Sequence, residues 1–138
     1  MNAGPIEDRL AIRELRETYA DAVIRADPDR WIANWAEDGM WVIAALNIEL
    51  KGRDAILATW KAAMAELAFI GFFAVGGEIE VSGDRAHGTA YCRELMYPKA
   101  GGKRAVIGRY TDEYVKRDGR WLFAKRSYEV LKQDDTPA

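Results

Sequence analysis

Few residues in this sequence have the type and spacing that catalysis or metal binding requires. The chain of 138 residues contains one histidine, His87, and one cysteine, Cys92. A single histidine excludes a multi-histidine metal site, and a single cysteine excludes an internal disulfide. Neither residue has a visible partner that would activate it, which favours a structural role for both. Because no glycine-rich strand-to-helix turn is present either, the sequence predicts no metal and no bound cofactor.

Arg126 is the residue with the most direct claim to a chemical role. Strict strand alternation places it on one face with Ala124 and Tyr128. If that face is buried, the guanidinium needs an acceptor, because an unpaired buried charge is costly. The acceptor is either an internal carboxylate, Glu94 or Asp112, or an anionic or carbonyl-bearing ligand. A cross-strand ion pair of purely structural purpose is the alternative.

Asp27 is the second candidate catalytic residue. It lies in the segment Asp27-Pro-Asp29, where it would supply a carboxylate near the end of the first helix. The competing interpretation is a helix N-cap, because aspartate followed by proline commonly begins a helix.

Aromatic side chains are candidates for the lining of an internal pocket, with tyrosine hydroxyls as hydrogen-bond donors. Plain core packing is the alternative for each of them. The aromatic residues predicted to line the pocket, together with Arg126, are Tyr19, Trp41, Trp60, Tyr110 and Tyr128.

Three helices are expected in the first half of the chain. Apolar residues recur at three- and four-residue steps from Leu10 to Ala26, which is typical of an amphipathic helix. Pro28 begins a second, short helix carrying Trp31 and Trp35. A third helix follows Gly52 and extends toward residue 67.

Strands dominate the rest of the chain, separated by glycine-containing turns. Helices followed by successive hairpins predict an α+β fold, with the three helices packed on a curved, mostly antiparallel sheet. We expect one domain over residues 1–138, ordered from about 5 to 131, with a polar tail over residues 132–138. The expected strands are 41–43, 48–50, 78–81, 86–97, 106–115 and 121–131.

Several short motifs occur in an order and spacing that resemble a known family. The strongest are Gly108-Arg-Tyr-Thr-Asp-Glu-Tyr114 and Arg117-Asp-Gly-Arg-Trp121, preceded by Val81-Ser-Gly-Asp84. From about Ile6 to Leu131 the chain resembles the SnoaL-like branch of the nuclear transport factor 2-like superfamily, which has a cone-shaped, cystatin-like fold. The nearest resemblance is to hexachlorocyclohexane dehydrochlorinase-like and scytalone dehydratase-like members.

This resemblance implies a pocket for a small hydrophobic molecule and a His–Asp dyad that acts as general base. In this sequence the aspartate position falls at Ile24, and the histidine position at Gly71 or Phe72. Both halves of the dyad are therefore missing, whereas Arg126 matches an active-site arginine of the dehydrochlorinases. Ile24 and Phe72 join the predicted pocket lining. The chain is thus expected to be a lyase, isomerase or hydrolase with a different acid–base set.

A non-catalytic ligand-binding or dimerisation module is the alternative function. The other sheet face, with Trp121 and Phe123, is expected to form a homodimer. Lys and Arg number 20 against 22 Asp and Glu, a net charge of −2, which predicts neither nucleic-acid nor membrane binding. The first residues have no apolar signal core, so a cytoplasmic protein is expected.

Overall fold

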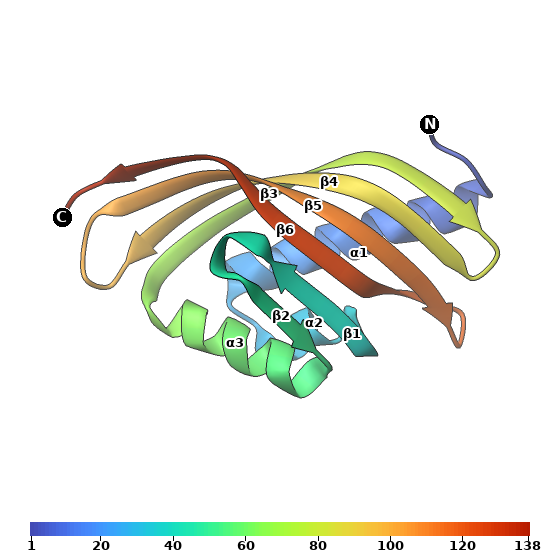
Figure 1. Ribbon diagram of the computed structural model, residues 1–138, viewed down its shortest axis with the longest axis horizontal. Coiled ribbons are helices and arrows are strands. Elements are labelled where there is room, and N and C mark those ends of the chain that lie inside the picture. The colour runs from blue at the N-terminus through green and yellow to red at the C-terminus, as the bar shows by residue number, and fades with distance from the viewer.

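Three helices pack on a single six-stranded sheet in the computed structural model, which describes residues 1–138 (Figure 1). The strand order is β2-β1-β6-β5-β4-β3, and only the β1–β6 pair is parallel. The α+β class and the mostly antiparallel, curved sheet are therefore confirmed. The elements are α1 (Ile6–Arg25), α2 (Pro28–Ile32), β1 (Trp35–Ile43), β2 (Ile48–Lys51), α3 (Arg53–Ala65), β3 (Leu67–Ser82), β4 (Arg85–Pro98), β5 (Lys103–Arg117) and β6 (Arg120–Thr136), with a 3₁₀ turn at Ala44–Leu46.

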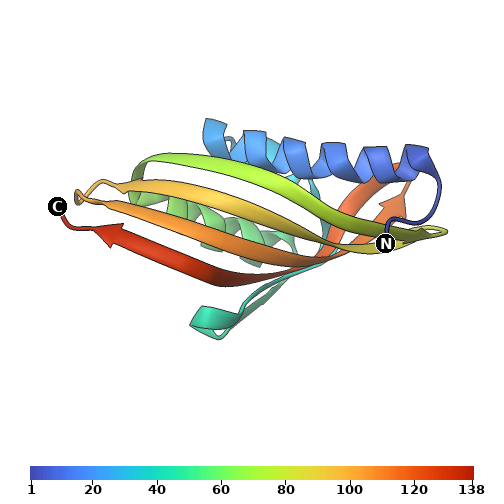
Figure 2. The same cartoon turned by 90° about the horizontal axis from the view of Figure 1, so that it is seen from above.

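The helices lie on one side of the sheet, which we call the concave face. Figure 2 shows α1 running alongside β3, and Figure 1 shows α3 beneath the part of the sheet nearest the C-terminus. The opposite, convex face carries no helix. No helix in the structure has the length and apolar composition needed to cross a membrane.

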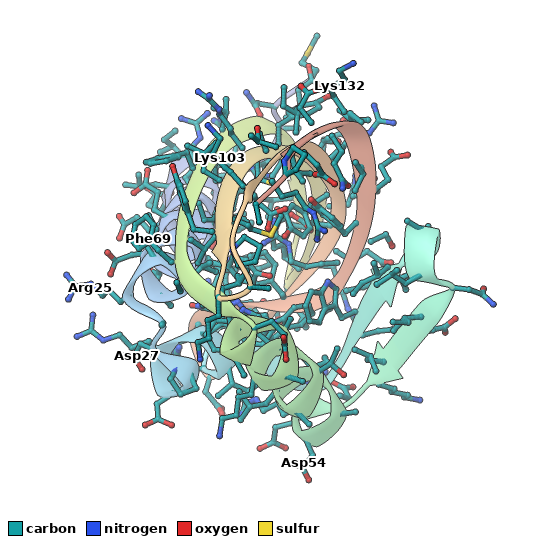
Figure 3. The ribbon with its side chains drawn as sticks, turned by 90° about the vertical axis from the view of Figure 1, so that its left-hand side faces the viewer. Arg25, Asp27, Asp54, Phe69, Lys103 and Lys132 are labelled. Atoms are coloured by element: carbon teal, nitrogen blue, oxygen red, sulfur yellow. The ribbon has the colours of Figure 1, made fainter.

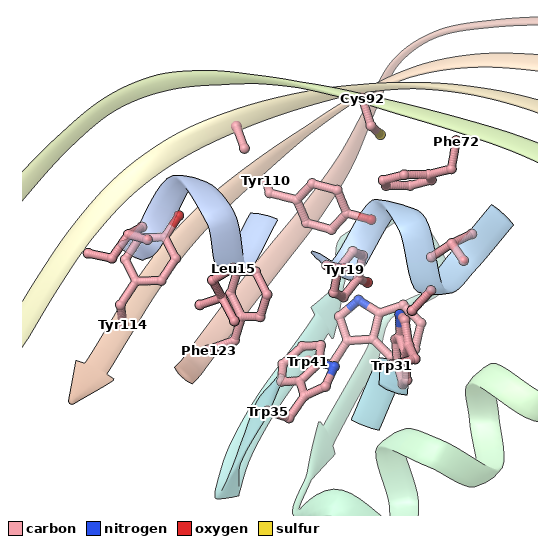
Figure 4. Packing of buried hydrophobic residues seen from close by; sticks show 14 of the residues in the cluster. Leu15, Tyr19, Trp31, Trp35, Trp41, Phe72, Cys92, Tyr110, Tyr114 and Phe123 are labelled. Atoms are coloured by element: carbon pink, nitrogen blue, oxygen red, sulfur yellow. The ribbon is translucent and has the colours of Figure 1, made fainter. Parts of the chain in front are cut away.

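The core between the helices and the concave face is rich in aromatic rings (Figure 4). The Tyr19 ring on α1 lies 5.9 Å from that of Phe72 on β3. The indoles of Trp31 and Trp60 stack with centroids 4.6 Å apart, which joins α2 to α3. Edge-to-face and offset contacts of this kind stabilise a core beyond the area they bury.

Several expected element boundaries are wrong; β3, for instance, spans Leu67–Ser82 where the sequence predicted a strand over residues 78–81. Trp35 begins β1 and does not belong to the second helix, which ends at Ile32. The predicted polar tail is also strand for its first five residues, because β6 continues to Thr136 (Figure 1). That extension pairs with the start of β5, where Arg104 and Asp135 form an ion pair at 3.4 Å. Backbone hydrogen bonds and cross-strand charge pairs thus stabilise this two-stranded extension. Its polar composition gave no sign of a strand in the sequence.

A β-bulge in β6 changes which side chains face the core. Phe123 pairs with Tyr114 and Lys125 pairs with Glu113, so Ala124 is an extra residue without its own partner. Such a bulge reverses the alternation on one side of it. Phe123 therefore lies on the same concave face as Arg126, fully buried. Trp121 is buried as well. The prediction that Trp121 and Phe123 form an exposed patch on the other face is therefore wrong.

Candidate functional site

Arg126 and Asp112 form a buried ion pair on the concave face. Arg126 on β6 is the strand partner of Asp112 on β5. Only 2 % of the surface of Arg126 is exposed, and 0 % of that of Asp112. The Arg126 Nε donates to Asp112 Oδ1 at 2.8 Å, and Nη2 donates to Oδ2 at 3.1 Å. Planar, two-bond pairing of this type satisfies both charges at once. Asp112 is therefore the acceptor that the buried guanidinium required, and the cross-strand alternative describes this contact.

Aromatic rings enclose the Arg126 guanidinium on its remaining sides. Its central carbon lies 3.6 Å from the ring centroid of Tyr110 and 4.5 Å from that of Tyr19. Burial by itself lowers the pKa of Arg126, but the neighbouring Asp112 charge raises it above its ordinary value. The arginine is thus built into the core. Asp112 occupies the Nε and Nη2 donors, whereas Nη1 has no hydrogen bond to a protein group, so contact of Arg126 with a ligand stays a prediction.

The pair extends through a tyrosine to a second buried arginine. The Tyr114 hydroxyl donates to Asp112 Oδ2 at 2.7 Å and accepts from Arg16 Nε at 2.8 Å. Arg16 comes from α1 and is 4 % exposed, so one carboxylate serves two buried guanidinium groups. Burial raises the pKa of Tyr114 far above its ordinary value, which keeps this hydroxyl protonated.

A second polar pair lies on the same face and has no ion-pair partner. The Tyr128 hydroxyl on β6 donates to Glu94 Oε2 on β4 at 2.6 Å. Glu94 forms no ion pair, and burial raises the pKa of its carboxyl. Burial likewise raises the pKa of the nearby Cys92 thiol to about 12. A carboxyl whose pKa is raised by its surroundings is a suitable proton acceptor and donor.

Gly108 makes room for the tyrosine of this pair. A Cβ placed on Gly108 would lie 2.6 Å from the Tyr128 hydroxyl oxygen, well inside van der Waals contact. The absent side chain lets the Tyr128 ring lie against the backbone of β5, and its centroid is 4.8 Å from that of Tyr110. The position of the hydroxyl beside Glu94 therefore depends on a glycine in mid-strand.

The structure does not place Asp27 beside Arg126. Its carboxylate accepts from the Arg30 backbone N–H at 3.1 Å, and it also pairs with the Arg30 side chain at 3.4 Å. Figure 3 shows it on the outside of the molecule, apart from the side chains inside the curved sheet. These contacts match the N-cap interpretation. Both of these contacts are to Arg30, and none is to a residue inside the sheet.

The predicted pocket-lining residues divide into three groups. Five of the aromatic residues pack in the buried core, and Figure 4 labels Tyr19, Trp41, Phe72 and Tyr110 among them. Tyr128 is only partly buried. Ile24 is 37 % exposed and lies outside the core. Ile24 and Phe72 both border a surface groove between α1 and β3. Whether the core aromatics contact a ligand stays a prediction. The core aromatics are Tyr19, Trp41, Trp60, Phe72 and Tyr110.

Sequence reasoning missed two members of these networks. Arg16 was not singled out, although it is four residues from Ile12 and three from Tyr19, on the apolar stripe of α1. A charged residue at such a position is the signal that could have found it. Glu94 was considered only as a partner for Arg126, and its contact with Tyr128 follows from strand register. No group of three or more histidine, cysteine or acidic side chains is arranged to hold a metal ion.

Comparison with known proteins agrees with this architecture. A hexachlorocyclohexane dehydrochlorinase structure superposes with a TM-score of 0.86 at 21% identity, over 96% of this chain and 91% of that one. Two Novosphingobium aromaticivorans structures also match over 96% of this chain. One, a candidate aromatic ring hydroxylase, has a TM-score of 0.89 at 26% identity over 96% of its length. The other, a candidate scytalone dehydratase, has a TM-score of 0.88 at 21% identity, and the match covers 90% of its length.

No curated protein sequence matches the chain. The model of the SnoaL-like domain matches residues 5–127, which is most of the chain. That range contains Arg16, Asp112, Tyr114 and Arg126, and it ends one residue before Tyr128. The chain therefore belongs to the SnoaL-like domain family, within the nuclear transport factor 2-like superfamily.

Proposed function

We propose that the protein binds a small hydrophobic molecule on the concave face beside Glu94, and that Glu94 and Tyr128 transfer a proton there as a lyase or isomerase. The observation that carries this proposal is the Glu94 carboxyl itself. It is partly buried, has a raised pKa, contacts only a hydroxyl and has no cationic partner. Perturbed titratable groups without a structural ion pair are candidates for catalysis.

The surroundings of the pair suit an apolar ligand. Glu94 is opposite Phe72 on β3 and Val106 on β5 in the strand register, so its neighbours on the concave face are apolar. Met96 and Val130, on the same face, are incompletely buried, which leaves apolar surface available for contact. Small-molecule sites commonly combine such walls with a few placed polar groups.

The chemistry assigned to the pair needs no cofactor. The Glu94 carboxylate accepts a proton from carbon, and the released electron pair forms the new double bond. In a lyase the leaving group departs with its own bonding pair, and in an isomerase Glu94 returns the proton to a different carbon. Tyr128 holds the carboxylate in position through its hydrogen bond. This pair takes the place of the His–Asp dyad, which this chain lacks at positions 24 and 71–72.

Proton exchange tests the proposal without knowledge of the natural substrate. The protein is incubated in D₂O with 2-tetralone, a small hydrophobic ketone with acidic C–H bonds, and deuterium incorporation is followed by mass spectrometry. We expect exchange above the buffer rate, and a loss of at least about tenfold in Glu94→Gln, because general-base catalysis contributes at least that much. Glu129→Gln is the matched control. Glu129 is an exposed carboxylate of the same strand as Tyr128, paired with Arg109.

Binding without exchange would favour the alternative function, a non-catalytic ligand-binding module. Titration with the neutral fluorophore N-phenyl-1-naphthylamine measures binding independently of chemistry. A wild-type protein that neither binds this probe nor exchanges the ketone would contradict the proposal.

We also propose that the convex face forms a homodimer. Phe69, Phe73 and Val75 on β3 and Ile107 on β5 are each about half or more exposed, and the rings of Phe69 and Tyr97 lie 6.0 Å apart. Several exposed apolar side chains on one sheet face support a protein interface. Analytical ultracentrifugation should show a dimer that Val75→Glu dissociates, because Val75 is exposed on this face and does not line the α1–β3 groove. A wild-type monomer at 100 μM would count against it.

A further inference from the structure

The charges of the hydrogen-bonded network that joins Arg16 and Arg126 do not balance. Arg16 and Arg126 are both almost fully buried, and Asp112 is the only carboxylate in contact with their network. Arg126 occupies both Asp112 oxygens, so Arg16 reaches that carboxylate only through the Tyr114 hydroxyl. A buried cation without a direct counterion is costly, and proteins compensate for it with an anion.

The hydrogen bonds of Arg16 are also incomplete. Its Nε donates to Tyr114, and its Nη1 makes only a long contact of 3.4 Å with the Gly77 carbonyl. Its Nη2 is buried and has no partner. Arginine offers five donors in a planar fork that suits a carboxylate, and here most of that fork is unused.

Two glycines leave room for the Arg16 guanidinium in this position. A Cβ on Gly76 would lie 2.6 Å from Arg16 Nη1, and one on Gly88 would lie 2.8 Å from Nη2. Glycine weakens a strand interior and often marks a close approach. The sheet is therefore shaped to accommodate the Arg16 head group, beside the groove that Gly76 helps to line.

That groove lies between α1 and β3 and has a volume of about 610 Å³, within the range of small-molecule sites. Arg16 and the exposed Arg13 are both part of its lining, and half of the lining residues are apolar. Of the two carboxylates on the groove, Asp21 pairs with Arg25 at 2.8 Å, and Glu17 is solvent-exposed. The apolar lining residues are Ala20, Ile24, Phe72, Phe73 and Ala74.

We propose that the α1–β3 groove is a second binding site, which takes a small carboxylate with an apolar body. The carboxylate pairs with Arg16 through Nη1, which lies next to Gly76 of the groove lining, and the apolar body lies against Ile24 and Phe72. This site is separate from the Glu94–Tyr128 pair, which lies on β4 and β6 and forms no part of the groove lining. Ligand in the groove would supply the counterion that the buried network lacks.

The test uses 2-naphthoate and its neutral isostere 2-naphthamide as probes. Their affinities are measured by calorimetry, and ¹H–¹⁵N spectra locate the binding site. We expect saturable naphthoate binding that shifts the amides of residues 16–24 and 72–76, with naphthamide at least about tenfold weaker, because the charge contact is lost. Arg16→Met should abolish the preference for naphthoate.

A surface variant keeps the test independent of the fold, because Arg16 is buried. Ile24→Glu places a negative charge on the groove and should weaken naphthoate binding at least about tenfold. Leu10→Glu is the matched control, since Leu10 is exposed on the same helix but does not line the groove. It should leave the affinity unchanged.

Three results would each overturn the proposal. They are equal affinity for naphthoate and naphthamide, amide shifts confined to β4 and β6 around Glu94, and no saturable binding of naphthoate. The second of these would leave the function proposed for Glu94 intact.

Discussion

Replacing Asp112 by asparagine removes the only carboxylate that contacts the Arg126 guanidinium. Asp112 accepts three hydrogen bonds, two from Arg126 and one from Tyr114, in a fully buried position. The arginine would remain charged, because a guanidinium group keeps its proton in proteins even without a counterion. Breaking one partner of a buried ion pair costs about 3–5 kcal/mol.

That cost translates into a large change in melting temperature. Unfolding entropy scales at about 2.1 cal/mol/K per residue, so a chain of 138 residues loses about 3–4 °C for each kcal/mol. Asp112→Asn should therefore lower the melting temperature by about 10–17 °C. Urea unfolding followed by tryptophan fluorescence gives the free energy directly, and an unchanged m-value shows that the folded state has kept its compactness.

A surface pair of the same geometry is the control. Arg117 Nη1 and Nη2 donate to the two Asp38 oxygens at 2.8 and 3.2 Å, with side chains 42% and 65% exposed. Asp38→Asn should cost less than about 1 kcal/mol, since exposed ion pairs contribute little. If Asp112→Asn costs no more than Asp38→Asn, burial does not set the strength of the pair and the reasoning fails.

Three further predictions follow from the same face of the sheet. Cys92, whose pKa burial raises to about 12, should not react with Ellman's reagent at pH 8 until guanidinium chloride unfolds the chain; rapid reaction of the folded protein would contradict this. Burial raises the pKa of Glu94 above its unfolded value, so its contribution to stability is full at low pH and lost as pH rises through the folded pKa. Wild type should therefore lose stability relative to Glu94→Gln as pH rises from about 4.3, the ordinary glutamate pKa, through the higher folded pKa; parallel urea curves at all pH values would refute this. Gly108→Ala should displace the Tyr128 ring and lower the affinity for the fluorescent naphthylamine by at least about tenfold, with unchanged affinity as the opposing result.

Local patterns in the sequence predicted most elements of the fold. The apolar stripe of α1 and the glycine turns at 83 and 119 place a helix and two hairpins without reference to distant contacts. Asp27 followed by Pro28 predicted a helix N-cap, and the Asp27 carboxylate accepts the Arg30 N–H. These features depend on interactions within a few residues, which sequence reasoning can assess.

Features that depend on pairing between strands were beyond local reasoning. The bulge at Ala124 exists because β6 must match the register of β5, and it moves Phe123 into the core. The strand over residues 132–136 forms only because β5 lies beside it. The contact between Glu94 and Tyr128 joins residues from non-adjacent strands, so neither residue alone indicated the pair.

The pKa of the Glu94 side chain, measured by ¹³C NMR with the signal assigned through Glu94→Gln, tests the proposed proton-transfer site most directly. We predict a value above that of an ordinary glutamate, a further rise in Tyr128→Phe because the hydroxyl favours the charged form, and another rise when the naphthylamine excludes water from the site. A Glu94 carboxyl that titrates at an ordinary value and responds to neither change would contradict the account.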